Sequence, residues 1–271
     1  MKVTFWGTRG SYPIASPQTI KVGGRTSCVS VEFDQQLIIF DAGTGLISLG
    51  EDSRLQYYTQ ATILLSHLHH DHIMGIPFFK PIFLKEWTLN FYSGHASPFG
   101  GLEKALQTCF SPPYFPVPWE DFPATRHYHE FEPGRPLSID STDVMLETMA
   151  LDHPGGACGY RLSQQGHTIV YLTDTKHSNL LRPEFIRFSQ GADMLIYDST
   201  FTDTEFDQHP DWGHSTWKEA TAVAKAAKVK SLALFHHNPD HSDEEMQDIL
   251  TQAQAEFAGT ILGTDGLGIN L

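Results

Sequence analysis

The chain has 271 residues, of which 40% are hydrophobic and 12% aromatic, a composition typical of a globular protein with a deep core. Its 32 acidic and 18 basic residues give a formal net charge of −14, with no run of lysine or arginine, which argues against a large nucleic acid as partner. No apolar stretch reaches the roughly 18 residues of a membrane span. Three widely spaced cysteines, and an N-terminus without a signal-peptide pattern, favour a reducing cytoplasm.

The first half of the chain is predicted to be rich in strands. Runs of apolar and β-branched residues predict strands at 2–6, 27–33, 36–40, 61–65 and 89–93. A tight turn at Asp34-Gln35 joins the second and third of these strands. The Gly-rich sequence at 41–45 ends the third strand, a short helix is expected to begin at 47–49, and a further helix is expected at 101–109.

Residues 111–136 contain seven prolines and several aromatic residues. The aromatics argue against disorder, so we expect a long ordered loop or a lid-like insertion. The segment 114–119 could roof a pocket and stack on a base, or it could simply pack within the lid.

The second half is also predicted to begin with strands and to continue with helices. Strands are predicted at 144–150, 158–162, 168–172, 194–197 and 232–235, and helices at 216–227, with Ser215 as a cap residue, and at 243–257. Both halves run from strands to helices, which fits two sheets packed face to face with helices outside. We expect a single domain over 1–271.

The run Ser66–His72 is the most informative segment. It places four candidate metal ligands directly after the strand at 61–65: His67, His69, Asp71 and His72. Imidazole and carboxylate ligands suit Zn²⁺, and also Mn²⁺ or Fe²⁺. The side chains at 67 and 69 can converge on one ion while those at 71 and 72 face a second. A helix is expected to start at Ile73, and a histidine-rich surface loop is the alternative interpretation.

Three later residues have suitable chemistry in a similar position. His153, Asp174 and His236 each follow a predicted strand, and loops at strand ends commonly carry function. A lone histidine at a strand end is usually a hydrogen-bonded polar residue without a catalytic role. The joint occurrence with the first cluster is what favours a metal site. His236 is preferred to His237 because it directly follows its strand.

The sequence HLHHDH, together with His153, Asp174 and His236, resembles the metallo-β-lactamase fold superfamily over Val3 to His236. The resemblance implies an α/β fold, a four-layer αβ/βα sandwich of two mixed sheets flanked by helices, with a dinuclear site at one edge. It implies two sets of ligands and a bridge: His67, His69 and His153 for one metal, Asp71, His72 and His236 for the other, and Asp174 between them. Asp41 matches an acidic residue that would orient a ligand imidazole; a simple turn residue is the alternative.

Two further segments resemble the tRNase Z-type phosphodiesterases. Residues 195–201 are similar to their HEAT segment, with Asp198 in place of Glu, and residues 213–216 are similar to their GHST segment. This resemblance implies that Asp198 orients His214 and that His214 donates a proton to the leaving group. Helix capping is the alternative role for the second segment.

The chain departs from tRNase Z in one respect. Those enzymes carry a long basic arm before the bridging aspartate, whereas only twenty residues separate His153 from Asp174, enough for a hairpin. We therefore expect two divalent ions that activate a hydroxide, Asp71 as ligand and proton acceptor, and a small anionic phosphodiester as substrate, such as a cyclic nucleotide or cyclic phosphate. The alternatives are a carboxylic ester, thioester or lactone hydrolase, a tRNA 3′-processing endonuclease, and a non-enzymatic sensor or scaffold.

Some residues and properties keep open roles in the sequence. Arg9 and Arg25 could contact phosphate or be solvated loop residues, and His237 and His241 receive no role. No membrane partner is expected, and the chain could form a homodimer.

Overall fold

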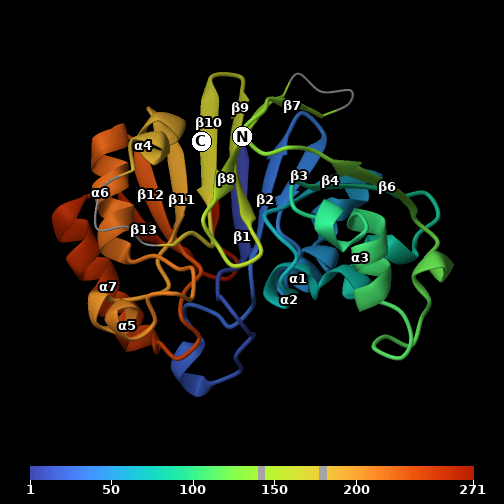
Figure 1. Ribbon diagram of the computed structural model, residues 1–271, viewed down its shortest axis with the longest axis horizontal. Coiled ribbons are helices and arrows are strands. Elements are labelled where there is room, and N and C mark those ends of the chain that lie inside the picture. Colours follow the sequence, from blue (N-terminus) through green and yellow to red (C-terminus); the bar gives the residue numbers. More distant parts are fainter. Residues whose placement is uncertain (140–143, 177–181) are drawn as a thin grey trace.

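Two seven-stranded mixed sheets face each other in the computed structural model, which describes residues 1–139, 144–176 and 182–271 (Figure 1). The first sheet has the order β14-β1-β2-β3-β4-β5-β6. Neighbours are antiparallel from β14 to β3 and parallel from β3 to β6. Its strands are β1 (Lys2–Gly7), β2 (Cys28–Phe33), β3 (Gln36–Phe40), β4 (Gln60–Leu65), β5 (Thr88–Ser93), β6 (Thr125–Glu130) and β14 (Gly268–Asn270).

The second sheet repeats this plan, with the order β13-β12-β11-β10-β9-β8-β7. Neighbours are antiparallel from β7 to β10 and parallel from β10 to β13. Its strands are β7 (Leu137–Ser138), β8 (Met145–Leu151), β9 (Ala157–Gln164), β10 (His167–Leu172), β11 (Met194–Asp198), β12 (Ser231–Phe235) and β13 (Thr260–Leu262).

Helices cover the outer face of each sheet (Figure 1). The first sheet carries α1 (Gly45–Gly50), α2 (His70–Ile73) and α3 (Leu102–Cys109), and the second carries α4 (Pro183–Ser189), α6 (Trp217–Ala227) and α7 (Asp243–Glu256), with α5 (Asp203–Gln208) after β11. Three separate apolar cores result, one between the sheets and one under each helix layer. The expected four-layer sandwich is therefore confirmed.

In the described part of the chain no helix is long and apolar enough to cross a membrane.

Most predicted elements agree with the structure, including the tight turn at Asp34-Gln35, where both residues have a positive φ. The helix expected to start at Ile73 is different, because α2 begins at His70 and ends at Ile73. Gly75 then packs against the loop after β3, where a Cβ would lie 2.0 Å from the carbonyl oxygen of Gly43. Pro77 follows, so the chain continues as short 3-10 turns.

The segment 111–136 is not a loop throughout. Strand β6 occupies part of it and extends the first sheet by parallel pairing with β5. Trp119 and Phe122 are buried in the core beneath the helices of that sheet. Aromatic packing against the first sheet therefore explains why this proline-rich segment contains so many large side chains.

Arg9 is fully buried, so neither role considered for it from the sequence is correct. Its guanidinium donates to the carbonyl oxygens of Gly23, Asn238 and His241, at 2.8 to 2.9 Å. These carbonyls belong to two loops that are far apart in the sequence. Arg9 therefore fastens the loop after β1 to the loop after β12.

We predict that Arg9→Met destabilises the protein by at least about 3 kcal/mol, because three carbonyls lose their hydrogen bonds in a buried setting. Chemical unfolding followed by circular dichroism measures this change. Arg135→Ala is the matched control, since Arg135 is exposed and pairs with Glu132 on the surface; it should cost less than about 1 kcal/mol. Equal stability of the two variants would contradict the role given to Arg9.

Candidate metal centre

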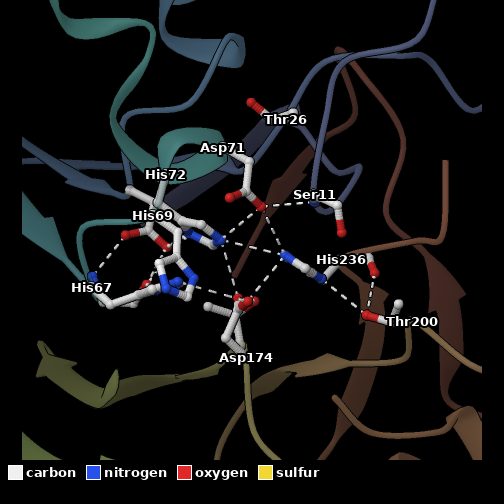
Figure 2. Close-up of polar contacts among 12 residues, drawn as sticks. Ser11, Thr26, His67, His69, Asp71, His72, Asp174, Thr200 and His236 are labelled. Atoms are coloured by element: carbon white, nitrogen blue, oxygen red, sulfur yellow. Dashed lines mark hydrogen bonds and ion pairs between the residues drawn. The ribbon is translucent and has the colours of Figure 1, made fainter. Parts of the chain in front are cut away.

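The candidate site lies where strands of both sheets end. Asp41 follows β3, and the segment His67–His72 follows β4. On the second sheet, His153 follows β8, Asp174 follows β10 and His236 follows β12. The close-up shows side chains from both sheets pointing toward one centre (Figure 2).

Three of these residues take a left-handed backbone conformation. The φ angles are 57° at Asp41, 54° at Asp174 and 58° at His236. Such angles are uncommon for residues other than glycine, and they cluster at functional sites where surrounding structure enforces them. Each angle ends the extended path of a buried strand and turns a polar side chain toward the space between the sheets.

All seven side chains predicted as ligands meet in one cluster. Potential ligand atoms lie within 4.8 Å of one another in overlapping groups that include His67, His69 and His153; His67, His72 and Asp174; and Asp71, His72 and His236. The Asp174 carboxylate is central, at 3.2 to 3.9 Å from the Nε2 atoms of His67, His72, His153 and His236. Asp174 thus occupies the position expected of a bridging ligand.

The imidazoles are oriented through their Nδ1 atoms. In His153, Nδ1 donates to the Gly213 carbonyl at 2.9 Å, and in His236 it lies 2.9 Å from the Thr200 hydroxyl. In His67, Nδ1 lies 3.0 Å from the hydroxyl of Ser66. Since these contacts use the Nδ1 hydrogen, the Nε2 lone pair is left to face the cluster.

Asp41 orients a fourth imidazole. Its carboxylate accepts from His72 Nδ1 at 2.7 Å, as the resemblance implied. It also accepts from the backbone N–H and hydroxyl of Ser66 at 2.7 and 2.8 Å, and from the hydroxyl of Tyr171 at 2.8 Å. Asp41 therefore links the segment after β4, which carries His72, to Tyr171 of β10. It is not a simple turn residue.

The donor set fits divalent metal ions. Nε2 of His67 is buried and has no hydrogen-bond partner among the residues that the structure describes. Nε2 of His72 lies 3.3 Å from Nε2 of His236, and Nε2 of His153 lies 3.2 Å from Nδ1 of His69. Tetrahedral ligands at about 2.0–2.1 Å from one zinc ion are themselves about 3.3–3.4 Å apart. Pairs of nitrogen atoms at this separation fit a shared cation.

The electrostatics of the cluster agree with this fit. Burial opposes protonation of His72 and His236, but the nearby carboxylates of Asp174 and Asp71 outweigh burial and raise both pKa values, that of His236 to about 9. Burial would raise the pKa of Asp174, yet the surrounding imidazoles hold it well below its usual range. The cavity therefore stabilises positive charge, which divalent ions would supply.

His214 and Asp198 form a pair beside the cluster. His214 Nδ1 lies 3.2 Å from the Asp198 carboxylate and 3.8 Å from that of Asp174. Asp198 also accepts from the backbone N–H groups of Thr175 and Thr200, and from the Thr200 hydroxyl, at 2.7 to 3.2 Å. Although burial opposes it, the charge of His214 lowers the pKa of Asp198. The structure thus brings together the two residues that the sequence paired.

The loop after β1 completes the site, although nothing in its sequence indicated this. The backbone N–H of Ser11 donates to Asp71 at 2.8 Å. At Gly10, a Cβ would lie 2.3 Å from the His236 ring, so only glycine allows this approach. Arg9 anchors the same loop. Of the supporting residues that sequence reasoning missed, only Ser66 had a signal, because it immediately precedes the first ligand.

Several candidate residues lie outside the cluster. His237 is buried, donates to the Gly263 carbonyl at 2.9 Å and has its pKa lowered by burial to about 3. His241 contacts Glu205 at 2.7 Å, and Arg25 pairs with Asp265 at 3.3 Å. His70 is exposed. The choice of His236 over His237 therefore agrees with the direction of the two side chains.

Two adjoining pockets open beside the cluster. One, of about 480 Å³, is called the polar pocket here because most of the residues that line it are polar or ionisable, including Asp71, Asp174 and His214; Trp212 also lines it. The other, of about 500 Å³, adjoins His67 and His69 and is lined by Phe99 and residues of α3. Among the described residues that line either pocket, none comes from 111–136. Of the two roles left open for the segment 114–119, packing within the protein therefore agrees with the structure.

Comparisons with known proteins agree with the fold. Residues 36–237 match the family described as Beta-lactamase superfamily domain. Ribonuclease Z of Thermoplasma acidophilum is 25% identical over 98% of this chain and 94% of its own length. The metallo-beta-lactamase fold protein YhfI from Bacillus subtilis superposes with a TM-score of 0.75 at 23% identity, covering 99% of this chain and 98% of that one.

A diphosphatase from the PhnP family superposes with a TM-score of 0.72 at 18% identity, covering 100% of this chain and 97% of that one. The family match alone spans about three quarters of the 271 residues. The strand order, the buried histidine and aspartate cluster and the full-length relatives agree with that match. The chain therefore belongs to the beta-lactamase superfamily, and its similarity to Ribonuclease Z over nearly its whole length supports the tRNase Z-like branch.

Proposed function

We propose that the chain is a metal-dependent phosphodiesterase that hydrolyses small phosphodiesters such as cyclic nucleotides or cyclic phosphates. The observation that carries this proposal is the His214–Asp198 pair, 3.2 Å apart, at the edge of a cluster suited to metal ions. An alkoxide leaving group needs a proton, and a carboxylate-held imidazole supplies one near neutral pH.

His214 has the position of a proton donor. Its Nδ1 faces Asp198, so Nε2 is the nitrogen available to a leaving group in the polar pocket that His214 lines. Its ring also stacks on that of His236, with centroids 4.9 Å apart. The imidazole therefore has little freedom to turn away from the reacting phosphate.

In this proposal His67, His69 and His153 would hold one ion, Asp71, His72 and His236 would hold the other, and Asp174 would serve both. The two divalent ions are proposed to be Zn²⁺, with Mn²⁺ and Fe²⁺ as alternatives. When bound, they would lower the pKa of water and withdraw charge from phosphoryl oxygens. Asp71 also accepts the proton of the attacking water. The Ser11 N–H holds its carboxylate in place for this step.

The short segment that connects His153 to Asp174 supports a small substrate. Between them lie β9 and β10, joined by a two-residue turn at Gln165-Gly166 with positive φ at both residues. The alignment with the Thermoplasma relative runs over 316 residues, so that protein contains residues that this chain of 271 lacks. A hairpin in place of an arm, and a net charge of −14, support a small substrate over tRNA.

A second candidate is hydrolysis of a carboxylic ester, thioester or lactone by the same centre. The apolar pocket beside His67 and His69 favours it, because such a pocket could hold an acyl chain. Esters of thiols or acidic alcohols need no proton donor, so the second candidate leaves the His214–Asp198 pair without a role.

We predict that the zinc-loaded protein holds two ions per chain after dialysis, and that Asp174→Ala loses both. His236→Ala should lose one, because it removes a ligand from only one of the two sets. Elemental analysis against protein concentration measures the ratio. Asp248→Ala, an exposed aspartate on α7, is the control and should keep two. One ion per chain in the unaltered protein would contradict the dinuclear proposal.

We predict that His214→Ala lowers kcat for a diester with an alkyl alcohol as leaving group by about 10²–10⁴-fold, with the metal content unchanged. For a p-nitrophenolate leaving group, which departs as a stable anion, the loss should be much smaller. Steady-state kinetics with both substrates measure the difference. His127→Ala, at an exposed histidine of β6, is the control. Loss of metal, or equal losses on both substrates, would show that His214 is instead a ligand or a structural residue.

A substrate panel separates the candidate functions. We expect turnover of bis-p-nitrophenyl phosphate, and rates at least about 100-fold lower with a thioester, a lactone and a precursor tRNA. The enzyme treated with chelator serves as the blank for each reaction. Turnover of the lactone without turnover of the diester would replace the first proposal with the second.

A further inference from the structure

We infer that the apolar pocket beside His67 and His69 binds the ester group that stays on phosphorus, and that this group is an aromatic ring or an aliphatic chain. The inference rests on the proposed function and narrows its substrate class to open-chain diesters, because in a cyclic diester both ester oxygens belong to one group that cannot enter two pockets on opposite sides. The substrate is then a singly charged diester with one apolar substituent, rather than a diphosphate or a polynucleotide.

The position of the pocket supports this assignment. It shares Leu68, His69 and Pro154 with the polar pocket, so a phosphate at the cluster reaches both. His214 and Trp212 line only the polar pocket. The group that receives the proton from His214 therefore leaves on that side. The remaining substituent points to the opposite side, toward His67 and the apolar pocket.

The lining indicates an uncharged occupant. Phe99, Leu68, Ala105 and Pro154 contribute apolar surface, and no described lining residue is lysine or arginine. The hydroxyl of Thr108 already donates to the Lys104 carbonyl at 2.8 Å. Burial lowers the pKa of His95, which favours the uncharged form of its ring. A second phosphate in this space would lack any counter-charge.

Small residues keep the pocket open. Gly156 has a φ of 82°, and a Cβ there would lie 2.7 Å from Nδ1 of His95. Gly155, with a φ of 84°, and Ala105 on α3 are the other small members of the lining. The volume of about 500 Å³ is within the range of roughly 300–1,000 Å³ of small-molecule sites. A phenyl ring or a short alkyl chain fits without movement of the chain.

The test keeps the leaving group constant and varies the retained one. Methyl, butyl and phenyl p-nitrophenyl phosphate share p-nitrophenolate, so differences in kcat/KM report the retained group. We expect the butyl and phenyl diesters to exceed the methyl diester by about 10–100-fold. Ala105→Phe, which fills the pocket, should remove this preference, so that the three diesters give similar values of kcat/KM. Lys104→Phe adds the same side chain to the same helix outside the pocket and should keep the preference.

A binding measurement separates this inference from the proposed function. Calorimetry of the zinc-loaded protein with methyl, butyl and phenyl methylphosphonate gives the affinity for each group without any turnover. A preference for butyl and phenyl that Ala105→Phe abolishes supports the pocket even where no diester is hydrolysed, an outcome that would reject only the phosphodiesterase. Equal affinity for all three, or a preference that survives Ala105→Phe, overturns the assignment of the pocket.

Discussion

Four carboxylates buried at one end of two facing sheets are the constraint on which the site depends. Asp41, Asp71, Asp174 and Asp198 are each at most 6% exposed. Removing a charge from water costs several kcal/mol unless it is compensated. Their contacts in the described residues are imidazoles, hydroxyls and backbone N–H groups, without lysine or arginine. Compensation must therefore come from protons on imidazoles or from cations between them, and the Nε2 atoms directed at Asp174 favour cations.

Such a cluster needs a rigid frame, and the sheets provide it. Asp41, Asp174 and His236 hold positive φ angles, each of which costs on the order of 1–3 kcal/mol. They follow β3, β10 and β12, whose side chains pack in the core between the sheets. Because the strands cannot shift, the strained residues keep their direction. Arg9 extends this frame to the loops, since it fixes the segment that brings Ser11 to Asp71.

The sequence predicted the strands that carry ligands because those strands are continuous apolar runs, and it predicted the cluster because ligands follow strand ends. It did not reveal β6, β13 and β14, which are edge strands with few buried residues or only three residues each. Nor did it reveal Arg9, since a buried arginine looks like a solvated one until its carbonyl partners are in place. The hydrogen bonds of Thr200, Tyr171 and Gly213 join distant segments, so no local pattern could indicate them.

Charge and shape act together on the proposed substrate. Positive charge in this site would come from the ions that the cluster holds. These ions would contact only one phosphate group. A further phosphate would lie either in the apolar pocket, without a counter-charge, or on a protein with a net charge of −14. The hairpin of β9 and β10 adds no basic arm to offset that repulsion. The same two features that argue against tRNA therefore also argue for a diester whose second substituent is uncharged and apolar.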